Sequence, residues 1–548
     1  MLFRIYSHKG HIPLNLCDTC ISISKSAVSK VPPDKTIQMQ VVDSESEAIR
    51  PQSTTSAWQS AKQNPRVILF GLGACVSATL WGFDIAESPL ASTAVAAVVV
   101  AIPEFKVVFG YEYEGELLIS ATWNSLWTAM AFLGMSIGSI VCGWLSDKAG
   151  RRPGFLVGCL SSIFGIGLQY AASRPAMLLA GKLINGFALG FFLTLTSTYN
   201  SEISPLPLRP VLTAAINFFM NAGQMAAMAV GLTRINILDS SSYKVTFASQ
   251  WSFPCAILLF ILILPESPHF LVRKSKYDAA RASIQRLYGK SARTATILEE
   301  IKIAVKRKRQ IAHFQRGEGY IACLKGSNFR RTRIACGMFL VQQVAGIAFY
   351  TQSLYFLGIC GLDVELTFKL ATASFGIALI GNILSSFLMS YIGIITYRTS
   401  HRTPPPPLTG TILNSTLLLS TGVAGCFHTH ISLLFLAYTM NFAIGVHAPT
   451  IGAVCWSVCS EISSLELRSH TQGLAMVVNA VVSWSLSFGT PYLINTDEAN
   501  LGGKAAFIWF GLCVLSFIWI WPEVPETKGR TAEDLDRLFE AKVPAWRF

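Results

Sequence analysis

Long apolar runs alternate with short polar connections over most of this 548-residue chain. Each run approaches the roughly 20 apolar residues that an α-helix needs to cross a bilayer. The first run begins near Val67, and five more follow in the first half, at about 121–145, 153–172, 176–199, 211–232 and 250–264. Six others fill the second half, near 334–357, 367–395, 409–427, 431–459, 471–494 and 504–522. The pattern predicts an all-α membrane protein with twelve transmembrane helices.

The polar segments divide this pattern into parts. Residues 1–65 have no sustained periodicity and are expected to form a disordered cytoplasmic tail. The first six-helix half then occupies 66–265 and the second 334–522. Between them, residues 266–333 contain seventeen Lys or Arg and five Asp or Glu, and predict a cytoplasmic linker with short amphipathic helices at 279–288 and 295–308. Residues 523–548 are expected to form a cytoplasmic C-terminal tail.

An internal repeat supports the division into two halves. The segment 201–209, SEISPLPLR, recurs as SEISSLELR at 460–468, with seven of nine residues identical and an offset of 259. Pro265-Glu266 recurs as Pro525-Glu526 at an offset of 260. Two matches at nearly one offset indicate a duplicated six-helix unit.

Composition agrees with a membrane protein and excludes several other classes. Hydrophobic residues make up 51% of the chain, charged residues 14%, and the mean hydropathy is +0.45. The net charge of +13 comes from cations in the loops, so we expect a lipid bilayer and no nucleic acid as partner. The thirteen cysteines lack metal-ligand spacing, and no glycine-rich nucleotide loop is present. We therefore expect no metal, no cofactor and no enzyme activity.

Two polar features stand out among the apolar runs. The connection at 143–152 is short, so it joins antiparallel neighbours, and its Lys and Arg residues place it on the cytoplasmic side. Within it, Asp147 is expected to pair with these cations or to cap the Gly150 turn. Asp84 lies inside the first run, where an ionisable group is costly and is a functional candidate. The alternative is that Asp84 lies near a helix end and is hydrated.

Several motifs together resemble the sugar porter family of the major facilitator superfamily, over roughly residues 67–535. The motifs are Gly-x-x-x-Asp-Lys-x-Gly-Arg-Arg at 143–152, Glu202 with Arg209, Pro265-Glu266-Ser267-Pro268, Gln342-Gln343-x-x-Gly346, Glu461 with Arg468, and Pro525-Glu526-Thr527-Lys528-Gly529. Segments 187–224 and 323–332 look most like fungal α-glucoside (maltose-type) proton symporters. The resemblance implies the major facilitator fold, in which two parallel six-helix halves alternate access to a midplane site.

The resemblance also implies a sugar site. A sugar offers hydroxyl groups and an apolar ring face, which amide and aromatic side chains can bind. Gln224, Gln342, Gln343 and Trp456 match sugar-contacting positions, with Trp456 stacking on the ring. For Gln224, a helix-to-helix hydrogen bond is the alternative role.

For coupling, Asp84 is the expected proton acceptor. Lys182 occupies the place where related proton-coupled porters have a basic residue in the fourth helix, usually arginine. The cytoplasmic ends are expected to form an ion-pair latch that opens during transport, or static salt bridges that position loops. Its members are Asp147, Arg151, Arg152, Glu202, Arg209, Glu266, Glu461 and Arg468.

The chain departs from the family pattern at His269, Pro210, Ala348 and Gly452-Ala453. In the second half the glycine-arginine hinge motif is missing, and we hypothesise that 394–410 is an insertion or an intron-derived translation. Residues 87–98 likewise lengthen the first helix beyond what relatives suggest. If both segments are genuine, they affect gating and coupling.

These observations predict a multi-pass transporter in the plasma membrane that imports a mono- or disaccharide together with a proton. A uniporter, a sugar sensor that does not transport, and an inactive paralogue are the alternatives.

Overall fold

The structure is a computed structural model in which residues 56–548 form one compact unit. It describes 57–545 except 88–102, 114–115, 119–120, 235–236, 238, 240, 290–292, 313–318, 351–368, 386–405, 428, 465–466, 495–498, 500, 526–531 and 542. Most of the predicted N-terminal tail therefore lies outside the described residues. Its last part forms a short helix, α3 (Ala57–Gln63), directly before the first membrane helix.

The first half contains six membrane-crossing elements, as predicted. They are α4 (Pro65–Glu87), α6 (Ala121–Ala149), α7 (Arg151–Tyr170), α8 (Pro175–Ile203), α9 (Arg209–Arg234), and α10 (Ser241–Ser249) followed by α11 (Ser252–Ile263). The connection after α4 contains a short helix, α5 (Pro103–Phe109), and a hairpin of β1 (Tyr111–Tyr113) and β2 (Glu116–Leu118). This hairpin is the one addition to the predicted all-α fold among the described residues.

The second half also has six such elements, two of them broken by π-helical turns. They are α16 (Gly326–Gln342) with η1 (Gln343–Ile347) and α17 (Ala348–Tyr350), the helix Lys369–Ser385, α20 (Pro406–Ala424), α21 (His430–His447) with η2 (Ala448–Gly452) and α22 (Ala453–Ile462), α23 (Arg468–Ile494), and η3 (Gly502–Ala505) with α24 (Ala506–Glu523). Nine spans in the described part are long and apolar enough to cross a membrane. With α9, Lys369–Ser385 and α20 they make the predicted twelve.

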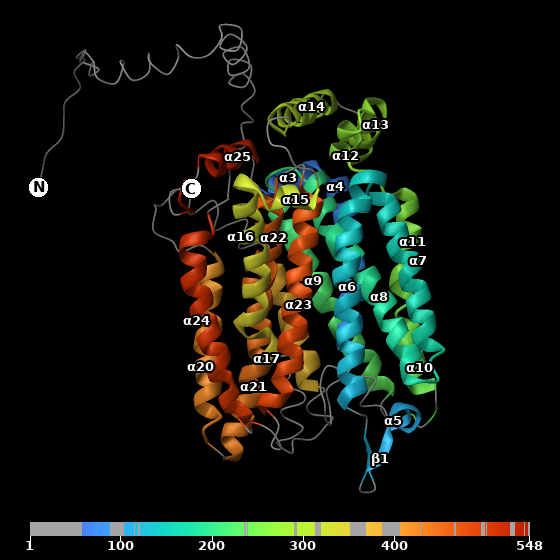
Figure 1. The fold of residues 1–548 in the computed structure, drawn as a ribbon, viewed down its shortest axis with the longest axis vertical. Helices are drawn as coiled ribbons and strands as arrows, with labels where there is room; N and C mark the ends of the chain where they lie inside the picture. Colours follow the sequence, from blue (N-terminus) through green and yellow to red (C-terminus); the bar gives the residue numbers. More distant parts are fainter. Residues whose placement is uncertain are drawn as a thin grey trace, which may run out of the picture. The chain divides into compact units, whose positions relative to one another are not determined.

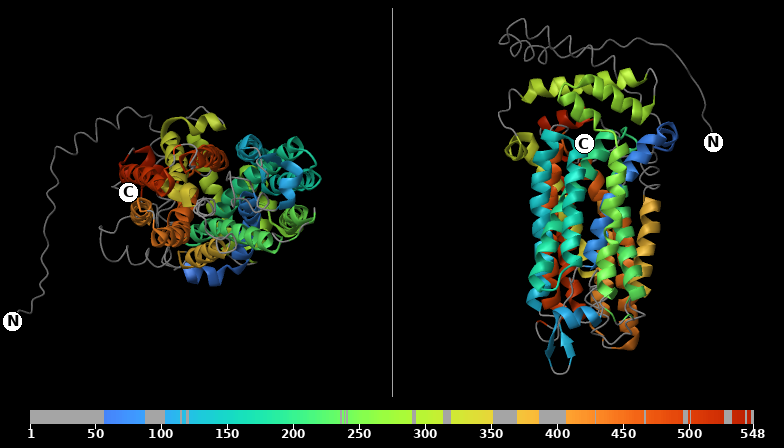
Figure 2. Two further views of the ribbon diagram at one scale, coloured as in Figure 1. Left: turned by 90° about the horizontal axis from the view of Figure 1, so that it is seen from below. Right: turned by 90° about the vertical axis from the view of Figure 1, so that its right-hand side faces the viewer.

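The two halves lie side by side (Figures 1 and 2). The linker helices α12 (Pro268–Arg273), α13 (Tyr277–Tyr288) and α14 (Arg293–Ala312) lie at the end opposite the β hairpin. Helices α13 and α14 confirm the two predicted amphipathic helices, and they share a small apolar core with α12. Helix α15 (Tyr320–Cys323) and the C-terminal helix α25 (Ala532–Glu540) lie at the same end. This is the predicted cytoplasmic end.

Glycine allows α4 and α9 to pack with their backbones in contact. A Cβ atom at Gly82 would overlap the carbonyl oxygen of Met220, and one at Gly223 would overlap that of Thr79. Small residues permit such close helix packing in membranes, where apolar burial alone does not drive association. The contact fixes the position of Asp84, two residues beyond Gly82.

Candidate functional site

A buried ion pair lies inside the first half. The Nζ atom of Lys182, on α8, donates to Oδ1 of Asp84, on α4, at 2.9 Å, and the side chains are 1% and 0% exposed. Asn185, one turn along α8, donates from Nδ2 to the same oxygen at 3.0 Å. The Asn185 amide is held in turn by Ser162 Oγ at 2.9 Å and by Gln250 Oε1 at 3.3 Å. Asp84 lies three residues before the end of α4, as the alternative expected, but its side chain is buried and not hydrated.

The second carboxylate oxygen of Asp84, Oδ2, differs from Oδ1 in its hydrogen bonding. Asp84 Oδ2 is buried and has no hydrogen-bond partner among the described residues. A buried carboxylate oxygen without a partner is costly. Asp84 therefore has one oxygen bound by Lys182 and Asn185 and one oxygen whose burial no described group compensates.

Two of the predicted sugar-contacting residues lie beside the breaks in the second half. Gln342 ends α16 and donates from Nε2 to the carbonyl oxygen of Gly452, in η2, at 3.1 Å, while its Oε1 accepts from Asn479 Nδ2 at 3.3 Å. Gln343 begins η1, which is kinked at Gly346, where φ is 105°. The break gives the two adjacent amides different surroundings, since Gln342 is buried and Gln343 half-buried.

Trp456 and Gln224 complete the predicted sugar site. Trp456 is 1% exposed and packs edge-on against Phe339, with ring centroids 4.9 Å apart. Its indole N–H has no partner among the described residues. Gln224 lies half-buried on α9, which packs against α22, the helix of Trp456. Within the described part of the chain, no hydrogen bond joins Gln224 to the other three residues.

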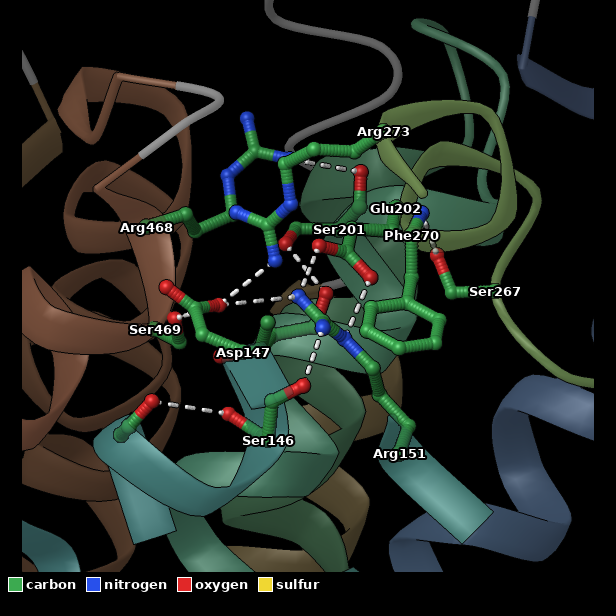
Figure 3. A network of polar contacts seen from close by, with 12 residues as sticks. Ser146, Asp147, Arg151, Ser201, Glu202, Ser267, Phe270, Arg273, Arg468 and Ser469 are labelled. Atoms are coloured by element: carbon green, nitrogen blue, oxygen red, sulfur yellow. Dashed lines mark hydrogen bonds and ion pairs between the residues drawn. The ribbon is translucent and has the colours of Figure 1, made fainter. Parts of the chain in front are cut away.

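The polar network at the predicted cytoplasmic end is built around Arg151 (Figure 3). Its Nε and NH2 atoms donate to the two oxygens of Glu202 at 3.0 and 2.7 Å, and NH1 donates to the Ser146 carbonyl at 2.8 Å. Both charged side chains are at most 3% exposed. This bidentate pair is internal to the first half.

Asp147 connects the two halves (Figure 3). One of its oxygens, Oδ1, accepts from Arg273 NH2 and from Ser469 Oγ, both at 2.7 Å, and Oδ2 lies 3.1 Å from His470 Nδ1. Ser469 and His470 are on α23, in the second half. The close cation partner of Asp147 is thus Arg273, outside the connection at 143–152 whose cations were predicted; of those, Arg151 lies 3.9 Å from Oδ1. Among the described residues Asp147 makes no hydrogen bond that caps the Gly150 turn.

The cap is supplied by Glu266 instead. Its carboxylate accepts from the backbone N–H groups of Arg151 at 2.9 Å, Arg152 at 3.1 Å and Ser267 at 2.9 Å. These N–H groups include the first two of α7, which have no partner within the helix. Gly150 precedes them with φ of 108°, and a Cβ atom there would lie 2.7 Å from Glu266 Oε2. The Arg152 side chain donates to the Ile261 carbonyl at 3.0 Å.

The two repeated Glu–Arg motifs, predicted as members of the latch, form contacts with other groups and with each other. Glu202 binds Arg151 rather than Arg209. Arg209 instead takes its largest favourable charge interaction from Glu461, in the other half. Arg468 donates from NH1 to the Ser201 carbonyl at 3.2 Å. The repeat thus forms contacts across the halves.

His269, one of the departures from the family pattern, lies among these groups on α12. Burial lowers its pKa to about 4, an effect that Glu202 opposes and that Arg468, Arg209 and Arg151 strengthen. The imidazole is therefore neutral at physiological pH. Sequence reasoning missed the contacts of Arg273, Ser469 and His470, although the last two directly follow Arg468.

The two unusual segments are described only in part. Residues 88–98 and 394–405 lie outside the described residues. The end of the proposed insertion, 406–410, forms the start of α20, where the Gly410 carbonyl accepts from Asn414 Nδ2 at 2.9 Å. These residues are part of a regular membrane helix.

Comparison with known proteins assigns the chain to a family. The family model described as "Sugar (and other) transporter" matches residues 72–539. The MFS transporter fmqE of Aspergillus fumigatus is 33% identical over 88% of this chain and 89% of its own. The general alpha-glucoside permease of Saccharomyces cerevisiae is 28% identical over 93% of this chain and 81% of its own.

A solved structure gives the same fold. The proton:xylose symporter XylE, bound to 6-bromo-6-deoxy-D-glucose, superposes with a TM-score of 0.71 at 20% identity, covering 87% of this chain and 99% of that one. These relatives are membrane transporters and not enzymes. The chain belongs to the sugar transporter family of the major facilitator superfamily.

Proposed function

We propose that this chain imports an α-glucoside or a hexose together with a proton, across the plasma membrane, by alternating access. The observation that carries the coupling is the Asp84–Lys182 pair, fully buried, with Asp84 Oδ2 lacking a partner among the described residues. Protonation at Oδ2 removes the charge that holds Lys182, so the pair has two states that a conformational cycle can use.

The substrate site is proposed from four side chains with the required chemistry. Gln224, Gln342 and Gln343 supply amide donors and acceptors, and Trp456 supplies a ring face. The indole N–H of Trp456 is buried without a partner in the described part of the chain. A sugar hydroxyl would satisfy this donor.

The cytoplasmic network is proposed as the inner latch. Asp147 binds Ser469 and His470 of the other half, and Arg468 binds the Ser201 carbonyl. These bonds close the cytoplasmic end, so they have to break for release. The Arg151–Glu202 pair and the Glu266 cap stay within one half and do not need to break.

The test is uptake of radiolabelled maltose and glucose into transporter-deficient cells at pH 5 and pH 7, with and without a protonophore. We expect faster uptake at pH 5 and loss of accumulation with the protonophore. Asp84→Asn should abolish accumulation while leaving exchange of sugar across the membrane, because the neutral amide mimics the protonated state. Surface expression is measured in parallel.

The outcomes separate the candidates. Accumulation that is independent of pH and protonophore would point to another energy source, and equilibration without accumulation would point to a uniporter. Binding without uptake of either sugar would contradict transport and favour a sensor or an inactive paralogue.

A second candidate substrate class is a solute other than a sugar. The family description includes other substrates, and the printed name of the Aspergillus relative specifies no sugar. This candidate predicts that neither maltose nor glucose is taken up, while Asp84→Asn still abolishes proton-driven uptake of the true substrate.

A further inference from the structure

The helix formed by α21 and α22 is interrupted by the π-helical turn η2, and side chains from three other helices bind that turn. Asn217, on α9, donates from Nδ2 to the Ala448 carbonyl at 2.9 Å. Ser385 donates to the Pro449 carbonyl at 2.6 Å, and Gln342 to the Gly452 carbonyl at 3.1 Å. Turns of this kind occur frequently at functional sites.

Asn217 is the only one of these three donors that belongs to the first half. Its amide nitrogen has a second acceptor, Asn382 Oδ1, at 3.0 Å. The Asn382 amide is oriented by its own helix, since its Nδ2 donates to the Ala378 carbonyl at 2.8 Å. Both hydrogens of the Asn217 amide therefore bind acceptors in the second half. The two side chains are 7% and 3% exposed.

The position of Asn217 along α9 is informative. It lies seven residues before Gln224, which is about 10 Å and two turns along one helix face. Arg209, at the start of α9, belongs to the cytoplasmic network. Asn217 therefore lies between the proposed sugar site and the cytoplasmic end.

The approach of Asn217 to η2 requires a small residue on the turn. A Cβ atom at Gly452 would lie 3.0 Å from Asn217 Nδ2. The same Gly452 presents its carbonyl to Gln342 and precedes Trp456 by about one helical turn. The first half thus holds the turn on which two proposed sugar-binding residues depend.

We propose that Asn217 is a positioning residue of the sugar site and its inner gate, which ties the first half to η2 and Asn382 until sugar is released. The identity of the substrate as a sugar rests on the proposed function, whereas the hydrogen bonds of Asn217 to η2 and Asn382 do not. Breaking the tie lets the cytoplasmic ends separate and reduces the population that accepts external sugar.

The first test is the KM for external [14C]maltose and glucose in cells. Asn217→Ala should raise KM about fivefold to tenfold, the effect expected for losing one or two buried hydrogen bonds, with little change in Vmax. Asn382→Ala should act in the same direction. The matched control is Asn221→Ala, because Asn221 is equally buried but, among the described residues, donates only to the Asn217 carbonyl of its own helix, at 2.7 Å.

The second test needs no sugar. Cys459 is fully buried in an apolar cluster that includes Cys75 and Leu193 of the first half. Asn217→Ala should speed its modification by N-ethylmaleimide in permeabilised membranes about tenfold, measured by mass spectrometry. Cys142, also fully buried but between α6 and α8 of one half, is the internal reference for unfolding.

The outcomes are decisive. If Cys459 in Asn217→Ala is modified no faster than in the Asn221→Ala control, the proposed gating role of Asn217 is contradicted, whether or not any sugar is transported. Faster modification of Cys459 and Cys142 alike would mean that the variant unfolds, and would also overturn it. If wild-type protein takes up neither sugar, but Asn217→Ala speeds the modification of Cys459 and not of Cys142, the gating role of Asn217 is supported and the proposed substrate is contradicted.

Discussion

Two buried ion pairs of the first half differ in how completely they are satisfied. In the Arg151–Glu202 pair, each guanidinium nitrogen donates to an acceptor and both carboxylate oxygens accept. In the Asp84–Lys182 pair, one carboxylate oxygen has no partner among the described residues. Opening a complete buried pair is costly, whereas a buried oxygen without a partner already makes the second pair costly to keep. We therefore propose a structural role for the first pair and a role in coupling for the second.

His269 gives a prediction about stability and pH. Its pKa of about 4 in the folded protein lies below the value of roughly 6.5 in an unfolded chain. The unfolded state therefore binds the proton more readily. The contribution of neutral His269 to the free energy of unfolding is complete above about pH 6.5 and is lost as pH falls toward 4. Because His269 is partly exposed, we expect a loss of only about 1–2 kcal/mol between pH 7 and pH 4.5.

The measurement is the melting temperature of the purified protein at pH 7, 5.5 and 4.5. His269→Gln should show a smaller acid-induced decrease than wild type, because glutamine does not titrate. Parallel decreases in the two proteins would show that His269 is protonated equally in both states.

At the residue scale, the sequence predicted which charges gather but not how they pair. Asp84 and Lys182 were expected together and are in contact. Glu202, Arg209 and Arg151 were all expected in the latch without assigned partners, and Glu202 binds Arg151, 51 positions away. Asn217 had no sequence signal beyond being an amide within an apolar run, because its partners come from helices more than 160 positions away.

At the scale of elements, the start of α7 depends on a residue from a different connection. Glu266 caps this helix, and Gly150 leaves room for its carboxylate. Gly150→Ala should be destabilising by about 2–4 kcal/mol, from a left-handed backbone without glycine and from displacement of the cap. Gly289→Ala is the matched control, because φ there is also positive, at 87°, and the described part of the chain places no non-neighbouring atom within 4 Å of the added Cβ.

The check is thermal unfolding of both variants in one detergent. The control isolates the backbone cost of about 1–2 kcal/mol. A melting temperature for Gly150→Ala equal to that of Gly289→Ala would mean that the Glu266 cap adapts without loss.

The helices themselves were well predicted from the apolar runs, and their ends were not. Helix α8 continues past the predicted residue 199 to Ile203, and α6 continues past 145 to Ala149. Apolar patterning reports burial in lipid, whereas a helix continues into the polar layer wherever its charged residues find partners. The breaks at η1 and η2 were also missed, because π-helical turns depend on contacts such as that of Gln342 with Gly452.

At the scale of the whole molecule, the halves are joined at several levels in the predicted cytoplasmic half of the bundle. Asp147 binds Ser469 at the outermost level, Ser457 donates to the Pro210 carbonyl at 2.9 Å further in, and Asn217 binds Asn382 nearest the proposed sugar site. If the halves move as rigid bodies, these bonds open together. Each then contributes to one equilibrium between closed and open cytoplasmic ends.

This shared equilibrium makes a quantitative prediction for Ser469→Ala. Loss of its bond to the Asp147 carboxylate should cost the closed state about 1.5 kcal/mol, which increases the open population and the modification rate of Cys459 about tenfold. Combined with Asn217→Ala, the two effects should multiply, because distant contacts that bias one equilibrium add in free energy. The control is Ser485→Ala, on the same helix, whose hydroxyl donates to the Val481 carbonyl of its own helix and, in the described structure, to no residue of the first half. The rates are compared under conditions in which the open state is still a minority. If Cys459 in the double variant is modified no faster than in the faster single variant, the two levels open separately and the halves do not move as rigid bodies.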